Sequence, residues 1–231
     1  MKKLCIIPAR GGSKRIPNKN FKEFLGKPII AYSIETALNS EIFDEVMVST
    51  DSEKIAEVAT KYGAKIPFMR SAKAADDFAT TAEVIKEVIE QYSKQKKEEY
   101  DLICCLYPTA PFVTKELLQK AFQKLQDKKY DAVFPVVAFQ SPVQRAIMIR
   151  EDKLSLMMPE YMNSRSQDLE TVYHDAGQFY WLRPEKTVAL NKMWTENTGV
   201  IEVSDLSAQD IDTETDWKMA ELKYKYFNEL T

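Results

Sequence analysis

Residues 4–20 read LCIIPARGGSKRIPNKN and contain the strongest indication of the fold. The stretch Leu4–Ile7 is apolar and β-prone, and Pro8 bounds it, as expected for a short buried strand of a parallel sheet. A long loop with two glycines and several cations follows, and Pro28 then opens a segment with apolar residues at helical spacing. The order strand, basic loop, helix is typical of α/β proteins, in which ligands bind beside the loops that follow the strands.

The alternation of strands and helices continues along the chain. Strands are predicted at 45–51, 66–68, 101–107, 131–139, 178–182 and 198–203. Helices are predicted after the capping residues Ser52, Thr80 and Thr114, and a last helix from about Thr213. This order favours a mostly parallel sheet covered by helices on both faces, a three-layer α/β fold. Residues 140–175 show no sustained period, so we interpret them as an insertion within one domain spanning 1–231.

Composition excludes several classes of protein. Lys and Arg total 32 against 35 Asp and Glu, so the net charge of −3 argues against a surface that binds nucleic acid through its phosphates. No apolar run reaches the roughly 18–20 residues of a membrane span, and the apolar start is too short for a signal-peptide core. The 3 cysteines lie in apolar stretches and are expected to be buried, reduced thiols. We therefore expect a cytoplasmic protein with neither a nucleic-acid nor a membrane partner.

His174 is the only histidine of the sequence. Zinc sites with two histidines, including HExxH, are therefore excluded. A Ser-His-Asp hydrolase would have only His174, and no GxSxG motif accompanies it. The chemistry is expected to depend on Arg, Lys and carboxylates, with a hard metal ion as a possible addition.

The basic loop after the first strand is a candidate polyphosphate site. Paired glycines allow backbone N–H groups to approach a phosphate, and the neighbouring cations offset its charge. The alternative is a solvated basic loop, and neither GxxxxGK[ST] nor GxGxxG is present. The residues concerned are Arg10, Gly11, Gly12, Lys14, Arg15 and Lys19.

The segment QDIDTETDW, residues 209–217, is a candidate metal site. In extended backbone Asp210 and Asp212 share one face, so both carboxylates could reach one Mg²⁺ ion. Alternatively, they are first-turn acids of the helix that follows. Arg70 by itself could be a surface arginine, YPTAPF (107–112) a structural turn, and His174 a packed side chain.

Taken together, these motifs resemble the CMP-nonulosonic acid synthetases, the acylneuraminate cytidylyltransferases. The resemblance spans nearly the whole chain, and its first and last motifs are highly specific in combination. It implies a Rossmann-like nucleotidyltransferase fold, CTP and Mg²⁺ as nucleotide and cofactor, and homodimers formed through the insertion at 140–175. The matching strings are IIPARGGSKRIPNKN, VSTDSEKIAEVATKYGA, YPTAPF, HDAGQFYW and QDIDTETDW.

The resemblance also assigns roles to individual residues. Catalytic roles are implied for Arg10, Lys14 and Asp212, and metal binding for Asp210 and Asp212. Nucleotide contacts are implied for Arg10, Gly11, Gly12, Ser13, Lys14, Asn20, Arg70 and Thr81. Sugar contacts are implied for Tyr107, Arg165, His174, Tyr180, Met193 and Trp194.

Two departures from the sialic acid enzymes concern the sugar. Those enzymes show QPTSP where this chain has YPTAP, and Arg-Pro-Asn-Gly where it has HDAG. At these points the chain is similar to the pseudaminic acid branch, whose CMP-sugar serves bacterial surface glycans, including flagellin. We therefore expect the anomeric hydroxyl of pseudaminic acid to attack the α-phosphorus of CTP in line, releasing pyrophosphate. Alternatives are a sialic, legionaminic or Kdo synthetase and a non-catalytic nucleotide-binding module.

Overall fold

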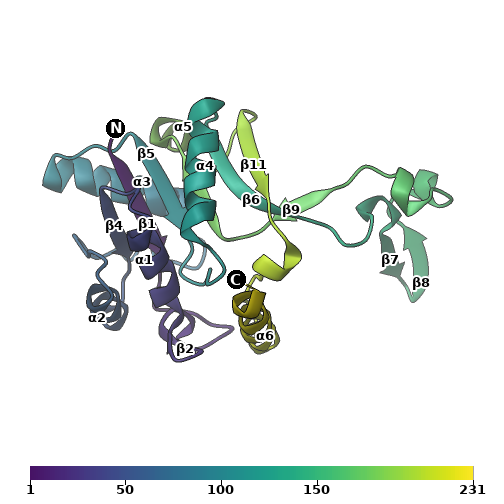
Figure 1. The fold of residues 1–231 in the computed structure, drawn as a ribbon, viewed down its shortest axis with the longest axis horizontal. Helices are drawn as coiled ribbons and strands as arrows, with labels where there is room; N and C mark the ends of the chain where they lie inside the picture. Colours follow the sequence, from purple (N-terminus) through teal and green to yellow (C-terminus); the bar gives the residue numbers. More distant parts are fainter. Residues whose placement is uncertain (231) are drawn as a thin grey trace.

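A seven-stranded sheet forms the centre of the computed structural model, which describes residues 1–230 (Figure 1). The strand order is β11-β6-β10-β5-β1-β4, with β9 paired to β6. β10 and β9 run antiparallel to their neighbours, and the other five strands share one direction, which confirms the predicted mostly parallel sheet. The strands are β1 (Lys3–Pro8), β4 (Glu45–Ser49), β5 (Leu102–Leu106), β6 (Ala132–Ala138), β9 (Tyr173–Asp175), β10 (Phe179–Leu182) and β11 (Thr198–Glu202).

Helices cover both faces of this sheet. Alternate residues of β1 face opposite ways, so Cys5 packs in one apolar cluster and Ile6 in the other. The cluster of Cys5 receives α1 (Ile29–Asn39), α2 (Glu53–Lys61) and α4 (Lys115–Asp127), and the cluster of Ile6 receives α3 (Thr81–Gln91). The short helix α5 (Pro184–Leu190) contacts α3. The three-layer prediction is thus confirmed, and all three cysteines are buried free thiols as expected.

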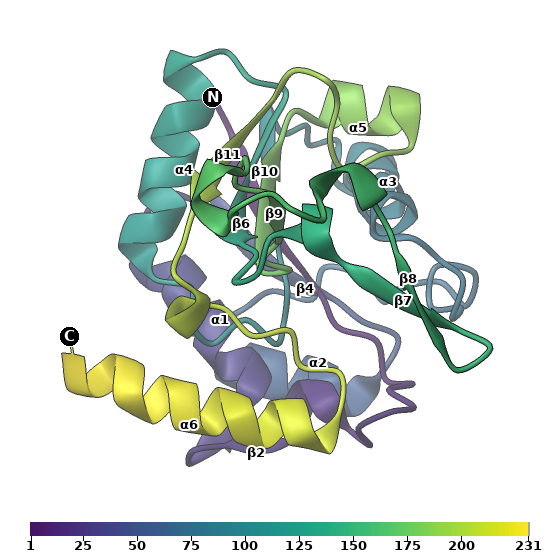
Figure 2. The same cartoon turned by 90° about the vertical axis from the view of Figure 1, so that its right-hand side faces the viewer.

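The last helix, α6 (Glu214–Leu230), packs beside β2 and the start of α1 (Figure 2). Its Trp217 and Tyr224 meet Phe24 edge to face, each with ring centroids 5.6 Å apart. Phe24 belongs to the two-residue strand β2 (Glu23–Phe24), which pairs with β3 (Lys27–Pro28). This aromatic contact places the acidic segment before α6 next to the loop that follows β1.

The predicted insertion contains a separate hairpin, β7 (Ile147–Arg150) and β8 (Lys153–Leu156), which stands away from the sheet (Figure 1). Its two turn residues have φ of 50° and 61°, as a tight two-residue hairpin turn requires. Tyr173–Asp175, the last three residues of the predicted insertion, are strand β9 of the main sheet.

One local prediction is wrong and one helix was not predicted. The predicted strand 66–68 does not form: the pairing stops at a single bridge between Met47 and Lys65, and Pro67 has no N–H to continue a ladder. The short helix α5 is not indicated by an apolar period in the sequence. The remaining short helices are η1 (Lys19–Phe21), the π-turn η2 (Tyr92–Lys96), η3 (Val143–Arg145), η4 (Pro159–Tyr161), η5 (Ser166–Asp168) and η6 (Asp205–Ser207).

A membrane span would need a longer and more apolar helix than any found among residues 1–230.

Candidate functional site

The loop after β1 is held in a defined shape by two hydrogen bonds and by the close approach of Gly11 to Ser52. The backbone N–H of Gly11 donates to Asp51 Oδ1 at 2.8 Å, at the carboxyl end of β4. A Cβ at Gly11 would lie 3.0 Å from Cβ of Ser52, so any other residue would push the loop and Ser52 apart. The buried Asn20 donates from Nδ2 to the carbonyl oxygen of Arg10 at 2.9 Å. The loop is therefore fixed against the sheet before any ligand arrives.

A cavity of about 400 Å³ lies between this loop, the segment leading from Arg70 to α3, and the end of β5. Its size suits a small-molecule ligand. Among the residues predicted to bind the nucleotide, Gly11 and Gly12 belong to the loop but do not line the cavity. The predicted residues that do line it are Arg10, Ser13, Lys14, Asn20, Arg70, Thr81 and Tyr107.

Arg70 is a buried cation on the wall of this cavity. It is 8% exposed, and its guanidinium donates to Ser49 Oγ at 3.0 Å and to the Ser49 carbonyl oxygen at 2.6 Å. Burial lowers its pKa, although an arginine stays protonated, and in the described part of the chain no carboxylate forms an ion pair with it. Asp51 and Glu87 act on this buried charge without forming an ion pair with it, so an electron-rich or anionic ligand in the cavity would stabilise it further.

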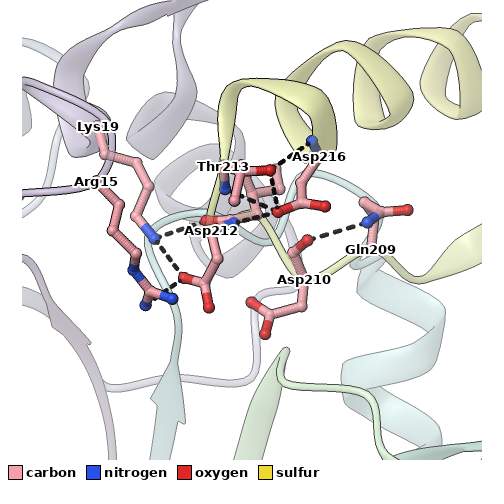
Figure 3. A network of polar contacts seen from close by, with 8 residues as sticks. Arg15, Lys19, Gln209, Asp210, Asp212, Thr213 and Asp216 are labelled. Atoms are coloured by element: carbon pink, nitrogen blue, oxygen red, sulfur yellow. Dashed lines mark hydrogen bonds and ion pairs between the residues drawn. The ribbon is translucent and has the colours of Figure 1, made fainter. Parts of the chain in front are cut away.

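The four cations of the loop each meet a carboxylate. Arg10 and Lys14 both pair with Asp77, and Arg10 Nη1 lies 2.7 Å from Asp77 Oδ1. Figure 3 shows the other two cations, which reach the segment before α6. Arg15 Nη2 lies 2.7 Å and Lys19 Nζ 3.4 Å from Asp212 Oδ1. The basic loop and the acidic segment, far apart in the sequence, are therefore in direct contact.

Asp210 and Asp212 lie side by side (Figure 3). Asp216 fixes this stretch, since its Oδ2 accepts from the N–H groups of Asp212 and Thr213 at 3.1 and 2.7 Å. The pKa of Asp210 is raised, chiefly by burial and next by the charge of Asp212. A divalent cation would offset this concentrated negative charge.

The two carboxylates fit an ion that arrives with a nucleotide. Mg²⁺ commonly takes one or two protein carboxylates and completes its shell with water and substrate phosphates. Throughout residues 1–230, His, Cys, Asp and Glu form no group of three or more that could enclose a metal. The donor set is thus sufficient for a shared ion and insufficient for a closed metal cage.

Four of the predicted sugar residues form a wall beside the cavity. Tyr107 Oη lies 3.1 Å from Thr81 Oγ1, and the rings of Tyr107 and Tyr180 are 5.6 Å apart. Tyr180 stacks with Trp194 at 6.3 Å, and Met193 packs against the same apolar cluster. Burial raises the pKa of Tyr107 to about 12, so its hydroxyl stays protonated and can donate. Because Tyr107 also lines the cavity, the wall and the nucleotide residues are continuous.

Arg165 and His174 are the two predicted sugar residues that the structure places neither in the cavity nor in this aromatic wall. Arg165 lies beside η5 in the insertion and pairs with Asp168, 2.7 Å from Nε to Oδ2. His174 is exposed on β9, donates from Nδ1 to the carbonyl oxygen of Asp175 at 2.9 Å, and packs on Phe139.

Three residues of the site were not predicted from the sequence. Asp51 anchors the glycine loop, and its position directly after β4 was an available signal, because ligands gather at the carboxyl ends of parallel strands. Asp175 accepts from Tyr180 Oη at 2.5 Å. Asp77 pairs with Arg10 and Lys14, and no spacing in the sequence indicates that contact.

Comparison with known proteins gives concordant matches. A family model described as cytidylyltransferase matches residues 4–198. The chain is 45% identical to the pseudaminic acid cytidylyltransferase of Campylobacter jejuni subsp. jejuni over 99% of both chains. It is 35% identical to the CMP-N,N′-diacetyllegionaminic acid synthase of Legionella pneumophila subsp. pneumophila, over 96% of this chain and 95% of the relative.

A structure of CMP:2-keto-3-deoxy-manno-octonic acid synthetase complexed with CTP superposes with a TM-score of 0.72. The match covers 99% of this chain and 100% of that one at 19% sequence identity. At this identity the likeness concerns the fold alone, and it confirms the predicted nucleotidyltransferase fold.

Proposed function

The chain belongs to the cytidylyltransferase family, and we propose that it activates pseudaminic acid by transferring CMP from CTP and releasing pyrophosphate. The observation that carries this proposal is the contact of the basic loop with Asp212 at the edge of a nucleotide-sized cavity. Such a contact brings phosphate-binding cations and metal-binding carboxylates to one place. The 45% identity with a pseudaminic acid enzyme supports the choice of sugar.

The residues would act mainly by positioning and by stabilising charge. Arg10, Ser13 and Lys14 would hold the triphosphate, with Asn20, Arg70 and Thr81 on the nucleoside side of the cavity. The anomeric hydroxyl of the sugar would then attack the α-phosphorus in line. Phosphoryl-type transfers need little covalent chemistry from the protein, so no histidine is required.

Asp210 and Asp212 would hold Mg²⁺ in this proposal. When bound, the ion would neutralise phosphate charge and favour departure of pyrophosphate. Arg15 and Lys19, which pair with Asp212 in the structure, would keep that carboxylate at the edge of the phosphate site.

The aromatic wall would receive the sugar. Tyr107 replaces the glutamine expected of sialic acid enzymes, and it joins the nucleotide residue Thr81 to Tyr180 and Trp194. A tyrosine cannot offer the paired donor and acceptor of a glutamine amide, so it would hold a differently substituted sugar. This local change supports pseudaminic acid over sialic acid.

We further propose that the chain forms a homodimer through the insertion at 140–175. The hairpin β7–β8 carries apolar side chains that its own chain leaves exposed, among them Ile149 at 79% and Leu154 at 67%. A contiguous exposed apolar surface of this kind suits a protein partner. Dimerisation would also place a second chain beside Arg165, which does not reach the cavity of its own chain. The free, buried thiols support a reducing compartment, the cytoplasm.

A panel of sugars tests the activity. The chain is incubated with CTP, Mg²⁺ and either pseudaminic, N,N′-diacetyllegionaminic, N-acetylneuraminic or Kdo acid, and pyrophosphate release is followed, with UTP in place of CTP as the control. We expect the highest kcat/KM with pseudaminic acid. A higher value with another sugar would reassign the substrate. CTP binding without release from any sugar would favour a non-catalytic nucleotide-binding module.

A further inference from the structure

Asp77 occupies the place of a ligand between two cations of the site. Its Oδ1 accepts from Arg10 Nη1 at 2.7 Å and its Oδ2 accepts from Lys14 Nζ. One carboxylate thus bridges two side chains with its two oxygens, in the manner that a phosphate group would. Asp77 lines the same cavity as both cations.

The bridge is also what attaches the tip of its loop to the rest of the protein. The segment 71–80 is anchored at one end by Ser71, whose N–H donates to Glu87 Oε1 at 2.9 Å, and at the other by the cap Thr80 of α3. Between these anchors, within the described residues, 72–79 make no hydrogen bond outside the segment other than the two at Asp77. Phe78 beside it is 92% exposed. Ala74 packs the start of the segment against the protein, whereas residues 76–78 at the tip are exposed, so the tip itself is held over the loop mainly by charge.

The ion pairs of Asp77 with Arg10 and Lys14 are exposed to solvent, so a ligand can replace them. The Asp77 side chain is 37% exposed and that of Lys14 is 76% exposed. Ion pairs at such exposure contribute little to stability and are readily exchanged. A polyphosphate carries several charges where Asp77 carries one, so it would compete effectively for Arg10 and Lys14.

We propose that Asp77 is a resident competitor for the phosphate site. In the empty enzyme it keeps Arg10 and Lys14 in position and folds the tip of segment 71–80 over them. The triphosphate displaces it, and it returns as pyrophosphate leaves. The competition selects against singly charged anions and shortens retention of the product. This inference rests on the proposed function, because it takes Arg10 and Lys14 as phosphate ligands.

Binding of anions to Asp77 variants tests the inference. Asp77→Asn removes the charge at nearly constant shape, Asp77→Glu keeps the charge, and Glu90→Gln gives the same change in net charge at an exposed ion pair on α3. Affinities for CTP and for inorganic pyrophosphate are measured by calorimetry without sugar. A ligand's apparent affinity is reduced when only a fraction of the sites is free to bind it. Because Asp77→Asn would leave more sites free, we expect it to bind both ligands about 3- to 10-fold more tightly than wild type. Asp77→Glu and Glu90→Gln are expected to stay near wild type.

Hydrogen exchange of residues 72–79 shows whether the ligand displaces Asp77 or whether the variant only lacks the repulsion between the Asp77 charge and an anionic ligand. In wild type, pyrophosphate should speed exchange in this segment, because the bridge to Asp77 is broken. In Asp77→Asn the exchange should already be fast and should not respond to pyrophosphate. Steady-state inhibition by pyrophosphate should strengthen in that variant, with a smaller change in kcat.

Equal or weaker pyrophosphate binding by Asp77→Asn, or unchanged exchange in wild type on adding pyrophosphate, would overturn the inference. If CMP-sugar is still made in that case, only the role of Asp77 fails. If wild type binds neither CTP nor pyrophosphate, the proposed function fails and the inference fails with it.

Discussion

At the scale of single residues, the site is organised by the pairing of charges. Asp212 receives Arg15 and Lys19, and Asp77 receives Arg10 and Lys14, whereas the buried Arg70 forms no ion pair within residues 1–230. To bind here, a phosphate-bearing ligand and its metal ion would have to replace these ion pairs with contacts of their own. At Asp212 the basic loop meets the acidic segment that precedes α6.

Replacing Asp212 with alanine tests this arrangement. We expect turnover to fall at least about 100-fold, the scale of losing a principal charge-stabilising group. The fold should persist, because Asp212 is partly exposed and Asp216 retains the bond from Thr213. Pyrophosphate release measures the first effect, and circular dichroism with thermal unfolding measures the second. Near-normal turnover would contradict the metal assignment.

How far the sequence predicts these residues depends on where their partners come from. Arg10 and Lys14 could be placed in one site because both belong to the loop that directly follows β1, whereas Arg70 was assigned to it only through the family resemblance. Asp77 could not, because its pairing depends on the path of an irregular loop, and that path is set by anchors at Ser71 and Thr80. Local periodicity contains no information about such a path.

At the scale of elements, capping motifs define where the helices beside the site begin. Thr80 accepts from the N–H of Glu83 through its side chain, and Glu83 accepts from the N–H of Thr80 at 2.7 Å. This capping box starts α3, and Thr81 in its first turn lines the cavity. The pattern Thr-x-x-Glu was visible in the sequence, so the start of α3 was predictable. The arm, by which we mean residues 140–172 with the hairpin β7–β8, was not, because no period of its own marks residues 140–175.

The capping box of α3 predicts a pH-dependent contribution to stability. The bond from the Thr80 N–H holds the pKa of Glu83 below its usual value. A depressed pKa in the folded state stabilises the fold above the unfolded pKa, near 4.5, and this contribution is lost as the pH falls through the folded value. Thr80→Ala should cost about 1 kcal/mol of unfolding free energy near neutral pH.

Urea unfolding at two pH values checks this expectation. Glu83→Gln should be less stable than wild type near neutral pH, and the difference should shrink in acid below the folded pKa of Glu83. Glu90→Gln, on the same helix, serves as the control. A difference that stays constant down to strong acid would show that the Glu83 charge does not contribute.

At the scale of the whole molecule, a packed body and an exposed arm differ in what covers their apolar residues. In the body, the two faces of the sheet are covered by helices of the same chain. In the arm, Ile147, Ile149, Leu154 and Met162 remain exposed. The sequence could indicate an insertion there but not its position, because its apolar residues are not buried against their own core.

Charge substitution on the arm tests the proposed dimer. Ile149 and Leu154 face each other across β7 and β8, so Ile149→Lys with Leu154→Glu keeps a favourable cross-strand pair while removing apolar surface. We expect the double variant to elute as a monomer, by size-exclusion chromatography with light scattering, where wild type is a dimer. Lys153→Gln at the hairpin turn is the matched control. A monomeric wild type would contradict the dimer.

The meeting of the first loop with the segment before α6 has a consequence for biosynthesis. Lys19 and Asp212 are 193 positions apart, so their contact cannot form until nearly all of the described chain has left the ribosome. A nascent polypeptide could already fold β1 and its glycine turn and yet lack the two carboxylates that we propose hold Mg²⁺. Translation that stops before Asp210 would therefore leave a product unable to consume CTP.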